Sequence, residues 1–227
     1  MNARLLALPF CLVAPAAWGH GVAGGDAAYL ESVAGVQFVP LMYLGAKHMI
    51  TGYDHLLFLA GVVFFLERIK DVALYATLFA LGHSCTLLLG VLAGIHANAY
   101  IVDAIIGVSV VYKALENLGA FRRLGLCVDT RLAVVAFGLA HGFGLSTKLQ
   151  DLSLSTVGLV GNIIAFNVGV EVGQIAALTI ILLGLRLWRR SRNFAQLAYS
   201  SNVLIMMAGM TLFGYQLTGY LLSSPTS

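Results

Sequence analysis

The chain has 227 residues, of which 59% are hydrophobic and only 10% are charged. Because an ordinary soluble domain is about 25% charged, this composition excludes a soluble globular domain and favours an α-helical protein that crosses a lipid bilayer several times. The 13 basic and 10 acidic residues nearly cancel, to a net charge of +3, and no long basic run is present, which argues against nucleic-acid binding.

The first 19 residues have the pattern of a cleavable secretory signal peptide. Arg4 precedes a short apolar run, and the small residues Ala17 and Gly19 mark a cleavage position after residue 19. The run is too short to span a bilayer, which needs about 20 apolar residues; an uncleaved first helix is the alternative. Cleavage places His20 at a new N-terminus, where its imidazole and the free amine either capture a metal ion on the outer face or are simply solvated.

Six apolar stretches of spanning length come after a short outer segment, rich in Gly and Ala, at residues 20–35. They fall at 49–66, 72–94, 100–119, 132–147, 157–185 and 197–221. We therefore predict an all-α polytopic membrane protein, in which residues 36–221 form a single compact bundle of about six transmembrane helices. Residues 222–227 are then an outer C-terminal tail.

Basic residues are distributed unevenly between the predicted connections. Placing the mature N-terminus outside leaves only Lys47 and Lys148 on the outer side and assigns nine basic residues to the cytoplasmic side. These nine are Arg68, Lys70, Arg122, Arg123, Arg131, Arg186, Arg189, Arg190 and Arg192. Since cytoplasmic loops carry an excess of Lys and Arg, we predict that both mature termini lie outside the inner membrane of a bacterial cell.

Glycine pairs with a spacing of four residues predict close helix packing within the bundle. They are Gly90/Gly94, Gly138/Gly142 and Gly169/Gly173. A weak internal likeness also relates Phe79–His83 (FALGH) to Phe137–His141 (FGLAH). It indicates either two related hairpins or a chance match.

Titratable side chains within predicted spans are functional candidates, because each one costs free energy unless it is paired or lines a polar cavity. In the first span, His48 and His55 share a helix face, since seven steps of 100° return to within about 20°, and Asp54 lies beside them. His83 and His141 fall near the midplane of the second and fourth spans. Any single histidine has an alternative interpretation as a hydrogen-bonding residue between helices.

Carboxylates complete the set of candidate residues. Glu116, in the third span, lies nearer the inner side and can be neutralised by Lys113, three residues away, whereas Glu171 falls near the midplane of the fifth span. Four further polar residues, Ser84, Asn117, Asn167 and Gln174, are expected to support the candidate residues.

Imidazole nitrogens combined with carboxylate oxygens suit an exchangeable transition-metal ion such as Ni, Co, Zn, Cu or Fe. A magnesium or calcium site would be nearly all oxygen, and a structural zinc site would use more thiolate. We predict a path that begins with capture at the outer side, continues through the midplane and ends with release at the inner side. In that order its residues are His48, Asp54 and His55, then His83, His141 and Glu171, then Glu116.

The same motifs resemble the HupE/UreJ family of small membrane proteins, regarded as nickel permeases associated with hydrogenase and urease systems. The resemblance covers about residues 48–174 and rests on H-x5-DH at 48–55, GHS at 82–84, YKALEN at 112–117, GLAHGFG at 138–144 and FNVGVEVGQ at 166–174. It implies nickel as the cargo and the seven path residues as its ligands. A homo-oligomer or metalloenzyme-maturation proteins are the implied partners. The chain departs from the family's Phe-His-Gly-x-x-x-Gly-Glu motif, because Ala140 precedes His141 and no Glu follows nearby, so Glu171 would supply the carboxylate.

The sequence contains no Walker GxxxxGK[ST] loop, so we expect facilitated diffusion driven by the membrane potential and no enzymatic activity. Three alternatives stay open at this point. One is a metal- or haem-binding redox or enzyme subunit that uses His83 and His141, although no HExxH motif supports a zinc protease. The second is a proton or small-anion conduit, and the third is an assembly subunit of a larger membrane complex.

Overall fold

The computed structural model describes residues 24–152 and 155–223, which form helices joined by turns and short connections. In chain order the helices of this part are α1 (Gly24–Ser32), α2 (Phe38–Thr51), α3 (Tyr53–Val63), α4 (Ile69–Ala93), α5 (Ala99–Asn117), α6 (Ala120–Arg123), α7 (Thr130–Gln150), α8 (Leu159–Trp188) and α9 (Phe194–Ser223). The predicted all-α class is thus confirmed for the described residues. The predicted signal peptide and His20 lie outside them.

Four of the described helices, α4, α7, α8 and α9, are long and apolar enough to cross a bilayer. Their bounds agree with the predicted spans at 72–94, 132–147, 157–185 and 197–221 to within three residues at each end. Helix α5 corresponds to the predicted span at 100–119. It has 19 residues and carries three charged side chains, Asp103, Lys113 and Glu116.

The predicted first span, at 49–66, is wrong, because the chain leaves the helical conformation at Gly52. Helix α2 ends at Thr51 and α3 begins at Tyr53, and the extended Gly52 between them has φ −76° and ψ 90°. The hydroxyl of Thr51, the last residue of α2, donates a hydrogen bond to the carbonyl of Lys47 in the preceding turn at 2.9 Å. Glycine has a low helix propensity, which makes a break at this position inexpensive.

Helices α2 and α3 nevertheless run one after the other beside the full length of α8. Near the start of α8, the backbone amide of Gln37 donates to the Asn162 side chain at 2.8 Å. Near its end, the Arg189 guanidinium donates to the carbonyl of Leu66, just beyond α3, at 2.7 Å. The break at Gly52 therefore lies about halfway along α8.

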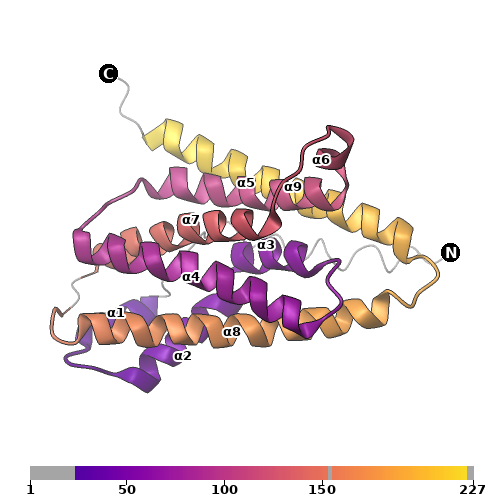
Figure 1. Ribbon diagram of the computed structural model, residues 1–227. Helices are drawn as coiled ribbons and strands as arrows, with labels where there is room; N and C mark the ends of the chain where they lie inside the picture. Colours follow the sequence, from indigo (N-terminus) through magenta and orange to yellow (C-terminus); the bar gives the residue numbers. More distant parts are fainter. Residues whose placement is uncertain (1–23, 153–154, 224–227) are drawn as a thin grey trace.

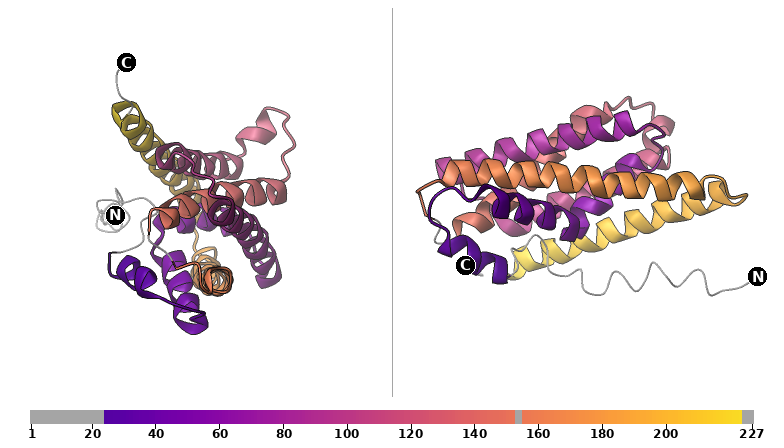
Figure 2. Two further views of the ribbon diagram at one scale, coloured as in Figure 1. Left: turned by 90° about the vertical axis from the view of Figure 1, so that its left-hand side faces the viewer. Right: turned by 90° about the horizontal axis from the view of Figure 1, so that it is seen from below.

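The long helices lie roughly along one common axis (Figures 1 and 2). They pack most extensively as three pairs, α2 with α8, α4 with α7, and α5 with α9. Helices α2 and α8 run in the same direction, whereas α4 and α7 both run in the opposite one. The connections after α3, after α5 and after α8 gather at one end of the bundle, here called the basic end, and those after α4 and α7 lie at the opposite end (Figure 1).

Glycines permit the close approach of paired helices, as their spacing predicts. Gly138 and Gly142 on α7 face the backbone of α4, and Gly169 and Gly173 on α8 face the backbone of α2. The predicted Gly90/Gly94 pair is only half correct. Gly90 packs against the Ser146 side chain, but Gly94 ends α4 with a φ of +63°, a conformation that glycine adopts without strain.

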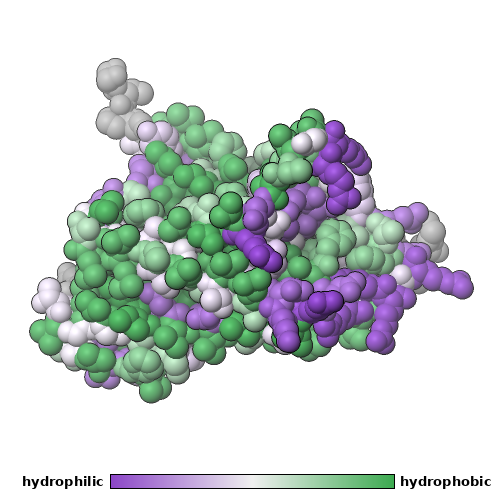
Figure 3. Space-filling view, in the orientation of Figure 1, coloured by the Kyte–Doolittle hydropathy of each residue, from purple (hydrophilic) through white to green (hydrophobic). Residues whose placement is uncertain are grey.

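Polar groups mark the two ends of the bundle. Figure 3 shows hydrophobic side chains over most of one face and hydrophilic ones concentrated toward the basic end. One residue before His48, the Lys47 ammonium donates to Asp26 at 2.8 Å and so ties α1 to α2. Lys148 pairs with the buried Asp103 at 3.3 Å and so ties α7 to α5.

Candidate metal site

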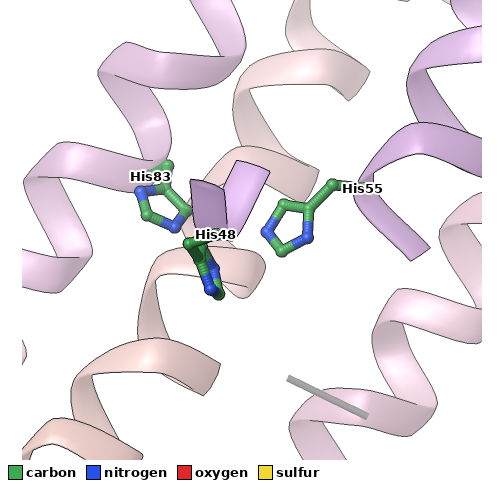
Figure 4. A group of neighbouring side chains, drawn as sticks. All are labelled: His48, His55 and His83. Atoms are coloured by element: carbon green, nitrogen blue, oxygen red, sulfur yellow. The ribbon is translucent and has the colours of Figure 1, made fainter. Parts of the chain in front are cut away.

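Three histidine side chains from three helices converge in the interior of the bundle. His48 lies in the last turn of α2, His55 in the first turn of α3, and His83 in the middle of α4. One ligand atom from each lies within 4.8 Å of those from the other two. Figure 4 shows the three imidazole rings pointing toward one another, and we call this set the histidine group. His55 and His83 are fully buried.

The break at Gly52 creates this group. A methyl at Gly52 would lie 2.7 Å from Nδ1 of His55 and 3.1 Å from the carbonyl oxygen of His48, so a larger residue would collide with both sides of the turn. The prediction that His48 and His55 share one face of one helix is therefore wrong. They meet because the end of α2 and the start of α3 face each other, with the two rings 5.3 Å apart.

Asp54 orients the His55 ring. Its Oδ1 accepts a hydrogen bond from the backbone amide of His55 at 2.9 Å and a second from the Nδ1 atom of the same residue at 3.0 Å. Because a carboxylate can only accept, Nδ1 carries the proton and Nε2 carries the lone pair that a metal ion would use. The structure therefore gives Asp54 a positioning role behind His55.

His141 places a fourth imidazole beside the histidine group. It lies on α7, is fully buried, and its ring centroid is 4.7 Å from that of His55. Its Nδ1 donates to the carbonyl oxygen of Phe137, one turn earlier, at 2.7 Å. This bond fixes the same tautomer as in His55, with the lone pair on Nε2.

The structure does not bring the two predicted glutamates into the histidine group. Glu171 is half-buried and accepts a hydrogen bond from the hydroxyl of Thr77 on α4 at 3.0 Å. Glu116 forms an ion pair with Lys113 at 2.9 Å, as its spacing predicts, and also accepts from the hydroxyl of Thr130. Both carboxylates thus act between helices, and their predicted role in the metal path stays a prediction.

The four predicted supporting residues occupy different positions. The Asn117 side chain donates to the carbonyl of Gly61 on α3 and to Asn202 on α9, both at 2.9 Å, and so ties α3 into the bundle. Ser84 is half-buried beside His83 on α4. The Asn167 amide donates to the carbonyl one turn earlier on α8, at 3.0 Å. Gln174 is fully buried on the same helix.

Aromatic rings enclose the histidines, a feature that the sequence analysis did not identify. Phe166 of α8 packs against His48, with ring centroids 5.7 Å apart, and Phe79 of α4 packs against His141 at 4.9 Å. Phe58 contacts Phe79 at 5.9 Å on the side that faces the basic end. In the sequence, the signal for this enclosure was the spacing of Phe residues one helical turn from a glycine or histidine. This spacing is also common in ordinary helix packing, so it did not distinguish the site.

The chemistry of the group favours a borderline transition-metal ion. Metal–nitrogen bonds to imidazole are about 2.0–2.1 Å, so two ligands of a tetrahedral ion are about 3.4 Å apart. The ligand atoms of the histidine group, which lie within 4.8 Å of one another, need to approach by up to about 1.4 Å to reach this spacing. Neutral imidazoles suit Ni, Co, Zn, Cu or Fe, and the nearby Asp54 carboxylate compensates part of a divalent charge.

A comparison with known families places the chain in one of them. Residues 25–224 match the family described as HupE / UreJ protein. The chain belongs to the HupE/UreJ family. HupE/UreJ is a transporter-type family, and membership suggests a role related to nickel or cobalt transport. The HupE/UreJ assignment and the four apolar helices fit a membrane protein. Neither a curated protein nor a solved structure matches the chain.

Proposed function

We propose that this protein is a permease for a transition-metal ion, with nickel as the first choice among Ni, Co, Zn, Cu and Fe. The observation that carries the proposal is the convergence of His48, His55 and His83. Ionisable groups inside a bilayer are costly and mark ion paths. Membrane carriers also commonly bind their cargo where a helix is interrupted near the midplane, which is the situation at Gly52.

The proposed topology has six crossings, with α2 and α3 together forming the first as one interrupted span. The others are α4, α5, α7, α8 and α9. The basic end faces the cytoplasm in this proposal, because its connections carry most of the Lys and Arg residues. Both mature termini are then outside the inner membrane of a bacterial cell, after removal of residues 1–19.

The driving force in this proposal is the membrane potential. A divalent cation that enters a negative interior gains about 4.6 kcal/mol per 100 mV, which is twice the value for one charge. That gain is sufficient for uptake without ATP. Because Lys113 already neutralises Glu116, we place the bound ion at the histidine group and His141 and propose no second site at Glu116.

The test is uptake of radiolabelled nickel into proteoliposomes that contain the purified protein. We expect His83→Ala to remove uptake, because His83 supplies one of the three converging imidazoles. His96→Ala is the matched control, since His96 lies exposed in the connection after α4 and should leave uptake unchanged. Equal uptake by the wild type and the His83 variant would refute the proposal, and uptake of another divalent ion in place of nickel would change only the cargo.

A further inference from the structure

Two segments of the chain have the same short motifs in the same order. Gly45-Ala-Lys-His48 on α2 corresponds to Gly138-Leu-Ala-His141 on α7. Phe79-Ala-Leu-Gly82 on α4 corresponds to Phe166-Asn-Val-Gly169 on α8. These correspondences differ from the likeness between Phe79–His83 and Phe137–His141, because those two segments lie side by side on the parallel helices α4 and α7.

The packing contacts at the glycines show the same equivalence of α2 with α7 and of α8 with α4. A methyl at Gly45 would meet the Phe166 carbonyl and lie 3.0 Å from the amide of Val170, four residues later. A methyl at Gly138 would lie 2.5 Å from the carbonyl oxygen of Phe79 and 3.3 Å from the amide of His83, again four residues later. The pair α2 with α8 and the pair α7 with α4 are therefore packed in the same way.

A second set of contacts agrees. A methyl at Gly169 would meet the carbonyl of Met42, three residues before Gly45, and a methyl at Gly82 would lie 2.5 Å from the carbonyl oxygen of Val135, three residues before Gly138. Agreement at the level of single backbone atoms goes beyond what shared glycine spacing would produce.

The two equivalent pairs run in opposite directions. Helices α2 and α8 run toward the basic end, whereas α7 and α4 run away from it (Figure 1). In the third pair, α5 and α9 are equivalent to each other. A methyl at Gly107 of α5 would lie 3.0 Å from the carbonyl oxygen of Gly209, and a methyl at Gly209 of α9 would lie 2.9 Å from the carbonyl oxygen of Gly107. The segment α2 to α5 and the segment α7 to α9 thus form an inverted repeat, an architecture that membrane carriers use for alternating access.

The repeat relates the aromatic contacts of the site. Phe166 packs against His48, and its equivalent Phe79 packs against His141, the equivalent of His48. Because the repeat is inverted, Phe166 covers the histidines from one end of the bundle and Phe79 covers them from the basic end. Each end therefore has a phenylalanine packed against the histidines, and at the basic end Phe58 adds a second one beside Phe79.

The two ends are packed unequally. A cavity of about 40 Å³ lies at the end opposite the basic one, lined by Leu30, Leu41, Ile163 and Phe166. At the basic end, Phe79 is fully buried against Phe58 and His141. Leu41 and its equivalent Val134 are both buried, at 3% and 1% exposed, so both ends are closed over the histidines and the cavity lies beside Phe166.

We infer that the protein is an alternating-access carrier with Phe166 and Phe79 as its two gates. In this structure both gates are closed, with the cavity on the Phe166 side. Opening of Phe166 exposes the histidines to the end opposite the basic one, and opening of Phe79 exposes them to the basic end. The identity of the cargo rests on the proposed function, whereas the exchange of gates follows from the repeat.

Cysteine labelling in vesicles of both orientations tests the exchange of gates. Leu41→Cys and Val134→Cys are introduced separately after replacement of Cys11, Cys85 and Cys127, and each is treated with an impermeant maleimide. We expect each cysteine to react from its own side alone, and any change that raises one rate to lower the other. Simultaneous reaction of both positions under all conditions would show a continuous pore and overturn the inference.

Substitutions at the gates can raise one labelling rate and lower the other without any need for nickel. Phe79→Ala removes packing at the gate of the basic end, so we expect labelling of Val134→Cys to rise about tenfold and labelling of Leu41→Cys to fall. Phe79→Leu, which keeps an apolar side chain, covers the case in which the alanine variant does not fold. Phe65→Ala is the matched control because Phe65 is 50% exposed. A rise at both cysteines would refute the reciprocal coupling.

Counterflow separates this inference from the proposed function. Proteoliposomes loaded with unlabelled nickel should take up radiolabelled nickel transiently above its equilibrium level. A carrier exchanges unlabelled nickel from inside for labelled nickel from outside, so the labelled ion accumulates before the two pools mix. Nickel flux without this overshoot would overturn the alternating-access inference and would still support nickel as the cargo. Reciprocal labelling with no nickel flux would instead support the carrier and overturn nickel as the cargo.

Discussion

Asp54 offers the sharpest test of how the site is built, because the structure assigns it to orientation of His55 and not to the histidine group. Its Oδ1 holds Nδ1 of His55 at 3.0 Å and the backbone amide at 2.9 Å. Removal of such a partner behind a metal ligand costs about 10–100-fold in metal affinity, or about 1.4–2.8 kcal/mol. We expect Asp54→Ala to weaken nickel binding by this factor without changing the number of ions bound.

Isothermal titration calorimetry of the detergent-purified protein measures both quantities. Asp54→Asn keeps an accepting oxygen for Nδ1 but loses the negative charge, so its affinity should lie between those of the wild type and Asp54→Ala. Asp151→Asn, an exposed carboxylate at the end of α7, is the control that changes net charge equally. Unchanged affinity in Asp54→Ala would refute the orienting role. Complete loss of binding, as in a ligand variant, would show that Asp54 itself holds the ion.

Three further predictions concern the packing around the site. Gly45→Ala should lower the free energy of unfolding by about 1–3 kcal/mol, because the added methyl meets a carbonyl of α8. Gly184→Ala is the control, because Gly184 has open space around it, and it should be neutral or stabilising. Thermal unfolding in detergent measures both variants. Lys113→Met should destabilise the protein by up to about 3–5 kcal/mol because Glu116 loses its ion partner, and Lys113→Met/Glu116→Gln should recover most of this loss in the same assay. Arg189→Met should increase protease cleavage of the connection between α3 and α4, because the guanidinium donates to carbonyls there; cleavage equal to that of the wild type would contradict this.

Helices whose apolar length decides their limits were predictable from the sequence. The bounds of α4, α7, α8 and α9 agree with the predicted spans because a bilayer requires about 20 apolar residues and polar connections end each run. The interrupted span was not predictable in this way, since the length of the stretch at 49–66 alone predicts one uninterrupted helix across Gly52. The Thr51-Gly52 dipeptide was the available signal, but it is also tolerated inside transmembrane helices.

The arrangement of the candidate residues was less predictable than the limits of the long helices. His48 and His55 were expected to be neighbours and are neighbours, but through a break between helices and not through helical periodicity. Glu171 was expected beside His83 because both fall near the midplane. Depth follows from position along a span, whereas the direction of a side chain depends on how each helix is rotated in the bundle. Glu171 faces Thr77, and no spacing within one helix specifies that rotation.

Metal binding by the purified protein tests the central claim most directly. Equilibrium dialysis against nickel would compare the wild type with His55→Ala/His83→Ala, which removes two fully buried members of the histidine group, and with the exposed-loop control His96→Ala. The account predicts tight nickel binding by the wild type and the control and its loss in the double variant. Equal nickel binding by all three proteins would contradict it.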